Sequence, residues 1–158
     1  MDVKVRLSGM IEGLSSVGRT HGIPVVFPMH PRTQKMMKEF GIDASGITST
    51  EPIGYMEFLE LEANARLILT DSGGVQEEAC IFRVPCVTLR ENTERPETID
   101  VGANVLAGTD ARRIIEAGDR MLSVANDWQN PYGDGNVGER IVGICTTKKR
   151  SDDSVLST

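Results

Sequence analysis

One short stretch constrains the fold more than any other: an apolar run that ends in Asp-Ser-Gly-Gly. The run, residues 67–69, has no polar alternation, as expected of a strand buried on both faces of a sheet. Asp71 and Ser72 follow, and either can cap a helix. Two glycines come next, and residues 75–80 then read as the opening of a helix. This order is that of a phosphate-binding corner between a strand and a helix.

The physical chemistry of such a corner favours an anion. The first amides of a helix have no internal partner, and the helix dipole is positive there. Ser72, Gly73 and Gly74, which we call the glycine corner, would let a phosphate approach those amides closely. Glu78, one turn into the helix, would repel a phosphate but could accept hydrogen bonds from ribose hydroxyls. The alternative is an ordinary tight turn with an N-cap, since Gly-Gly turns are common.

A second apolar run, residues 86–89, is followed by Arg90 and Arg95. In a parallel sheet the ends of successive strands lie on one edge, so these arginines are expected beside the glycine corner. A guanidinium there would suit a diphosphate. The alternative is a surface arginine paired with a nearby glutamate: Glu91, Glu94 or Glu97.

The rest of the chain alternates helix and strand. The predicted helices are residues 2–20, 33–40, 55–63, 95–101, 110–124 and 137–144, and the further strands are residues 24–28, 47–52 and 104–106. Such alternation predicts one α/β domain, residues 1–145, with a parallel sheet covered by helices on both faces. Residues 146–158 are polar and charged, and we expect a disordered tail.

His30 follows the strand predicted at residues 24–28, in a loop between two prolines. Loops at that edge of a sheet often carry binding residues, so His30 is a candidate. The alternative is an exposed or locally hydrogen-bonded loop histidine.

Composition excludes several classes of partner. The 158 residues carry a net charge of −6 and only 4% aromatic residues, which argues against nucleic acid and anionic membranes. No run of about 18 apolar residues exists, and no signal peptide is recognisable, so we expect neither a membrane span nor secretion. The three cysteines form neither a disulfide framework nor a zinc pattern, so we expect no metal and a reducing cytoplasm.

The motifs around the glycine corner resemble a known family. Asp-Ser-Gly-Gly-Val-Gln-Glu-Glu-Ala from Asp71, and Thr-Glu-Arg-Pro-Glu at residues 93–97, closely resemble the non-hydrolysing UDP-N-acetylglucosamine 2-epimerases. Phe-Pro-Met-His-Pro-Arg-Thr at residues 27–33 and Val-Gly-Ala-Asn-Val-Leu at residues 101–106 fit as well. The resemblance covers nearly all of residues 3–143, but it corresponds only to the C-terminal half of the family's chain.

The resemblance implies a GT-B-type enzyme of two Rossmann-like domains, with UDP held mainly by the C-terminal one. It implies UDP or a UDP-sugar as ligand, and no cofactor. By motif it assigns the glycine corner to phosphate, Glu78 to ribose, His30 and Arg95 to the diphosphate, and Phe58 to the uracil wall.

The sequence departs from the family in what it lacks. The family's acid–base carboxylates, with a lysine, an arginine and a His-Arg-x-Glu-Asn motif, belong to an N-terminal half that this sequence does not contain. We therefore expect a UDP-binding half that is inactive alone, that needs the N-terminal domain in cis or in trans, and that could form homo-oligomers. The catalytic residues stay unknown. The alternatives are a stand-alone nucleotide-sugar module and the nucleotide-binding half of a related glycosyltransferase.

Overall fold

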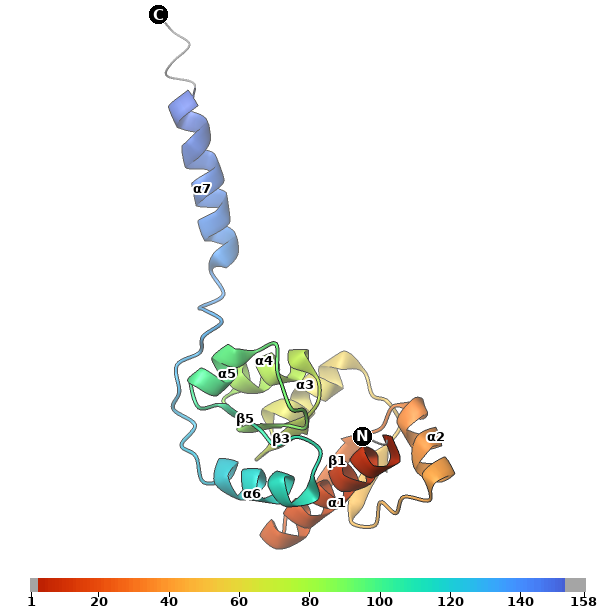
Figure 1. Ribbon diagram of the computed structural model, residues 1–158. Coiled ribbons are helices and arrows are strands. Elements are labelled where there is room, and N and C mark those ends of the chain that lie inside the picture. The colour runs from red at the N-terminus through yellow and green to blue at the C-terminus, as the bar shows by residue number, and fades with distance from the viewer. Residues whose placement is uncertain (1–2, 153–158) are drawn as a thin grey trace, which may run out of the picture.

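The computed structural model describes residues 3–152, and Figure 1 shows their arrangement. The helices are α1 (Val3–His21), α2 (Pro31–Phe40), α3 (Tyr55–Ala63), α4 (Gly73–Phe82), α5 (Pro96–Asp100), α6 (Ala111–Met121) and α7 (Val137–Asp152). The strands are β1 (Val25–Pro28), β2 (Ile47–Thr50), β3 (Ile68–Thr70), β4 (Cys86–Thr88) and β5 (Asn104–Leu106). The predicted alternation of helix and strand is confirmed.

The strands are all parallel, but they form two sheets rather than the single sheet predicted. β1 pairs with β2, and β4 lies between β3 and β5. In the larger sheet Ile68, Cys86 and Asn104 are in register. The prediction of one sheet failed because an apolar run marks a strand without specifying its lateral neighbours, which are decided by hydrogen bonds between distant segments.

Helices cover both faces of the three-stranded sheet, as predicted. Successive residues of β4 point to opposite faces, so Cys86 packs with Ile68 and with Ala79 of α4. Val87 packs on the other face against α1 and α6, where Ile114 is fully buried. Burying one such aliphatic side chain contributes about 1.5–3 kcal/mol, so the two clusters hold β3 and β4 between helical layers.

The capping residues confirm two predicted helix boundaries. The side chain of Asp110 accepts a hydrogen bond from the backbone N–H of Arg113 at 3.1 Å, as an N-cap does. Gly41 ends α2 with φ 63°, a left-handed conformation that glycine adopts without steric cost.

The last helix, α7, projects away from the other elements in Figure 1. Its apolar side chains are well exposed: Val137 64%, Ile141 56%, Val142 61% and Ile144 69%. The helix continues to Asp152, past residue 146, where the sequence predicts the start of a disordered tail. Thr146 supports the continuation by donating its hydroxyl to the carbonyl of Val142 at 3.0 Å. Residues 153–158 of that predicted tail lie outside the described residues.

Within residues 3–152, none of the helices combines the length and apolar character needed to cross a membrane.

Candidate functional site

The glycine corner lies where the sequence predicts it, between the end of β3 and the start of α4. Ser72 is the N-cap of α4 with extended backbone, φ −90° and ψ 130°, but its side chain makes no cap hydrogen bond. Its own N–H is held by Oγ1 of Thr70 at 3.0 Å. The first amides of α4 have no partner within the helix, so the corner presents donors at the positive end of a helix dipole.

The two glycines are not needed for the fold at this point. A Cβ built on Gly73 would lie 3.8 Å from Cζ of Arg95, and one on Gly74 would lie 3.9 Å from Oγ of Ser72. Both are ordinary van der Waals contacts, and neither residue has a positive φ. The two glycines leave the helix amides without a side chain over them, which favours the close approach of an anion.

Arg95 lies beside the corner, as predicted, and is partly buried. Its Nε donates to Glu77 of α4, and its Nη1 donates to the carbonyl of Glu94 at 3.0 Å. Arg90 is instead paired with a nearby glutamate, which was the alternative interpretation of these arginines. Its Nη1 and Nη2 donate to the two carboxylate oxygens of Glu94 at 3.0 and 2.8 Å. A Cβ built on Gly73 would lie 3.9 Å from Nη2 of Arg95 and 3.9 Å from Oε2 of Glu94, so Arg90 reaches the corner only through Glu94.

A buried polar network, which the sequence analysis missed, fixes the loop that carries Arg95. Gln76 of α4 is fully buried, and its Nε2 donates to the carbonyl of Ser72 at 3.2 Å. Its Oε1 accepts from Oγ1 of Thr93 at 2.5 Å, and Thr93 in turn accepts the N–H of Arg95 at 3.0 Å. One amide side chain thus ties the glycine corner to the arginine loop.

The same network reaches the edge strand β5. Asn104 donates its Nδ2 to Gln76 at 3.2 Å and to Oγ1 of Thr98 at 3.0 Å, and its Oδ1 accepts from Thr88 at 2.9 Å. One signal was present in the sequence: Gln76 lies three residues before Ala79 and four before Cys80, which places it on the buried face of α4.

Glu78, the predicted ribose acceptor, lies on α4 and is half-buried. Its Oε1 accepts a hydrogen bond from the hydroxyl of Tyr55 at 3.0 Å. That hydrogen bond raises the pKa of Tyr55. Phe58, assigned to the uracil wall, lies one turn further along the same helix, α3, and is half-buried. Phe58 and Glu78 thus lie on α3 and α4, two helices that pack against each other.

A second carboxyl group, not anticipated from the sequence, belongs to this cluster. Glu62 of α3 is 4% exposed, and among the described residues no N–H or hydroxyl group donates a hydrogen bond to either of its oxygens. Burial, then the neighbouring charge of Glu78, and then a side-chain hydrogen bond with Glu78 raise the pKa of Glu62 to about 7.

His30 is exposed and is the N-cap of α2, with its Nδ1 accepting the N–H of Arg32 at 3.2 Å. It follows β1, which belongs to the smaller sheet, whereas Ser72 and Arg95 follow strands of the larger one. The expectation that all three lie on one sheet edge is therefore correct only for Ser72 and Arg95.

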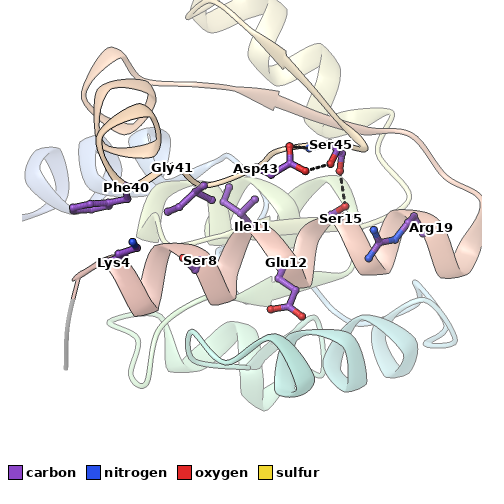
Figure 2. A pocket seen from close by; sticks show the side chains of 11 residues that line it. Lys4, Ser8, Ile11, Glu12, Ser15, Arg19, Phe40, Gly41, Asp43 and Ser45 are labelled. Atoms are coloured by element: carbon purple, nitrogen blue, oxygen red, sulfur yellow. Dashed lines mark hydrogen bonds between the residues drawn. The ribbon is translucent and has the colours of Figure 1, made fainter.

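A cavity of about 380 Å³ lies elsewhere, between α1 and the segment that joins α2 to β2 (Figure 2). Lys4, Glu12 and Asp43 are among its lining residues, and Ser15 closes one side by donating to the carbonyl of Ser45 at 2.8 Å. None of the predicted site residues lines it.

Parallel strands, a glycine corner at a helix N-terminus, an adjacent guanidinium and a carboxylate one turn on define an α/β domain with the layout of a phosphate-binding corner. Comparison with known proteins gives the family. The sequence family model for the UDP-N-acetylglucosamine 2-epimerases matches residues 1–146 of this chain. The chain therefore belongs to that family.

The relatives include the UDP-N-acetylglucosamine 2-epimerase of Methanocaldococcus jannaschii, which is 51% identical over 154 residues. That match covers 94% of this chain and 42% of the relative. The enzyme of the same name from Escherichia coli strain K12 is 38% identical over 138 residues, covering 82% of this chain and 37% of the relative.

Solved structures of UDP-N-acetylglucosamine 2-epimerases agree with this family assignment. The structure of the M. jannaschii UDP-GlcNAc 2-epimerase superposes with a TM-score of 0.85, covering 92% of this chain and 42% of that one. The same protein in complex with UDP-GlcNAc and UDP gives a TM-score of 0.81, at 51% identity, covering 91% and 41%. This chain therefore spans about two-fifths of the length of these relatives.

Proposed function

We propose that this chain is the UDP-binding portion of a UDP-N-acetylglucosamine 2-epimerase. One observation carries the proposal: the glycine corner, Arg95 and Glu78 are gathered around the first two turns of a single helix, α4. The likeness to a relative whose structure is a complex with UDP-GlcNAc and UDP supports it.

In this proposal each group meets one part of UDP. The free amides and hydroxyl of the glycine corner receive a phosphate, and the guanidinium of Arg95 turns from Glu77 toward the diphosphate. Glu78 accepts the ribose hydroxyls, and Phe58 lies against the uracil. We assign His30 to the diphosphate on the family's motif.

We propose that the complete enzyme inverts carbon 2 of N-acetylglucosamine by eliminating UDP and adding it back. Such chemistry needs an acid–base group within hydrogen-bond reach of the carbon-bound proton. Near the glycine corner Glu77 contacts Arg95, and Glu78 contacts Tyr55. We therefore place the acid–base groups in the part of the relatives that this chain does not match, supplied in cis or in trans.

We also propose a cytoplasmic protein that supplies an activated sugar for cell-surface polysaccharide. The cysteines support a reducing compartment: Cys80 and Cys86 are buried free thiols, and Cys145 is exposed and unpaired with another cysteine.

Calorimetry with UDP tests the binding proposal. We expect a dissociation constant between micromolar and millimolar, about −8 to −4 kcal/mol, because only part of the cleft is present. No heat and no shift in melting temperature at millimolar UDP would contradict it.

NMR of UDP-N-acetylglucosamine incubated with the protein tests the assignment of catalysis. We expect no UDP-N-acetylmannosamine from the purified chain alone, and product when the unmatched portion of a relative is added in trans. Product from the chain alone would show that the acid–base groups lie within it.

A further inference from the structure

Glu62 carries a buried carboxyl group near the candidate site, and the proposed function gives this group no role. Its side chain is 4% exposed, and within residues 3–146 no N–H or hydroxyl group donates a hydrogen bond to its two oxygens. An unpaired carboxylate in such a place is costly, since burial disfavours the charged form. A protonated carboxyl is different, because it gains an O–H that can donate to a neighbouring acceptor.

Three titratable groups interact electrostatically with Glu62: Tyr55 on its own helix, Glu78 on α4 and Cys86 on β4. Hydrogen bonding to Glu78 raises the pKa of Tyr55, and burial raises the pKa of Cys86 to about 12. Both therefore stay neutral around pH 7. The charged neighbour of Glu62 is the carboxylate of Glu78, a ready acceptor for a proton-carrying group beside it.

Counting acceptor positions gives Glu62 a role. A carboxylate offers about four lone-pair positions. The hydroxyl of Tyr55 occupies one position on Glu78, at 3.0 Å. A proton on Glu62 would occupy a second. Two positions then remain, which matches the two adjacent hydroxyls of a ribose.

We propose that Glu62 is a positioning residue of the nucleotide site: its protonated carboxyl donates to Glu78 and holds that carboxylate toward the ribose, and loss of this proton weakens nucleotide binding. The inference rests on the proposed function, because it assigns Glu78 to ribose. The linked step is a single deprotonation, in which the O–H bond of Glu62 breaks and the proton passes to solvent.

The direction of the pH effect follows from the raised pKa. As pH rises through about 7, Glu62 ionises and repels Glu78 across the packed helices α3 and α4. The folded state holds this proton more tightly than the unfolded chain does. Its contribution to stability is therefore fully present below the ordinary glutamate pKa and is lost as pH rises through about 7.

The experiment is calorimetry of UDP-N-acetylglucosamine binding between pH 5.5 and 8.5. This ligand is preferable to UDP, whose terminal phosphate itself titrates near about pH 6. One linked proton limits the change to about tenfold per pH unit, so we expect the wild-type affinity to fall about threefold to thirtyfold from pH 6 to 8.5. Glu62→Gln places a permanent amide donor at this position, and we expect its affinity to change by less than about twofold over that range.

Glu60→Gln is the matched control, because Glu60 is exposed on the same helix and should keep the wild-type profile. A direct measurement needs no variant: the ¹³C signal of the Glu62 carboxyl should titrate near pH 7, and its midpoint should rise when UDP-N-acetylglucosamine is bound.

The outcomes separate this inference from the proposed function. Binding with a flat wild-type profile, a Glu62→Gln profile equal to that of wild type, or a carboxyl midpoint that the ligand does not move would each overturn the role of Glu62 alone. No binding of UDP-N-acetylglucosamine by the wild type at any pH would overturn the proposed function, and this inference with it.

Discussion

Oγ1 of Thr93 donates to Oε1 of the buried Gln76 at 2.5 Å, joining the loop after β4 to the first turns of α4. The same oxygen accepts the N–H of Arg95 at 3.0 Å. Arg95 is thus placed beside Gly73 by a threonine two residues before it and a glutamine on the helix that carries the corner. The network fixes the backbone of Arg95 beside the corner before any ligand arrives.

Replacing this threonine should uncouple the loop from the corner. In Thr93→Val the N–H of Arg95 loses its acceptor, while Gln76 keeps its bond from Asn104. We expect a loss of about 1–2 kcal/mol in the free energy of unfolding, and UDP binding weakened about threefold to tenfold. Urea unfolding and calorimetry measure the two effects. Thr48→Val, on the exposed side of β2, is the control and should change neither.

Gly73→Ala should weaken UDP binding without lowering the stability of the fold. The added methyl group makes only ordinary contacts, and alanine is the better helix former, so we expect stability unchanged or raised by about 0.4–1 kcal/mol. UDP binding should fall about tenfold or more, because the methyl group covers the helix amides.

Gly138→Ala in α7, with nothing within 4 Å of the added carbon, controls for the general effect of the substitution. Thermal melts with and without UDP give both quantities. Unchanged UDP binding by Gly73→Ala would mean that the phosphate does not approach this corner.

Glu78→Gln should weaken UDP more than it weakens a diphosphate that lacks ribose. Hydrogen bonds to a charged group contribute about 1.5–3 kcal/mol, so we expect a loss of about tenfold or more for UDP and little loss for the ribose-free ligand. Competition calorimetry with the two ligands measures the difference, and Glu116→Gln, exposed on α6, is the control. Equal losses for both ligands would show that Glu78 acts on the fold only.

The exposed apolar face of α7 should cause the free chain to self-associate. Val142 is 61% exposed and lies beside Ile141, so Val142→Asp should make the protein more monomeric without abolishing UDP binding. Sedimentation velocity over a range of concentrations measures the change. Glu139→Gln, which leaves the apolar residues in place, should associate as wild type does. If Val142→Asp instead unfolds the domain, the helix belongs to its core.

The sequence by itself predicted much of the local structure. The bounds Tyr55–Ala63 and Asn104–Leu106 agree with α3 and β5, and the glycine corner begins α4 as expected. These features depend on neighbours in the chain: the length of an apolar run, a capping side chain, a glycine. The resemblance of the motifs to the epimerases was likewise readable from contiguous residues, and the family match over residues 1–146 confirms it.

Only the tertiary structure decided which distant groups meet. The hydrogen bonds between Thr93 and Gln76 and between Tyr55 and Glu78 join residues 17 and 23 positions apart, and no local pattern specifies such pairs. The burial of Glu62 depends on the packing of α3 against α4, so its raised pKa could not be foreseen from an acidic helix alone. Helical periodicity indicates which face of a helix is buried, but the partner on the other side is set by how the whole chain closes around its core.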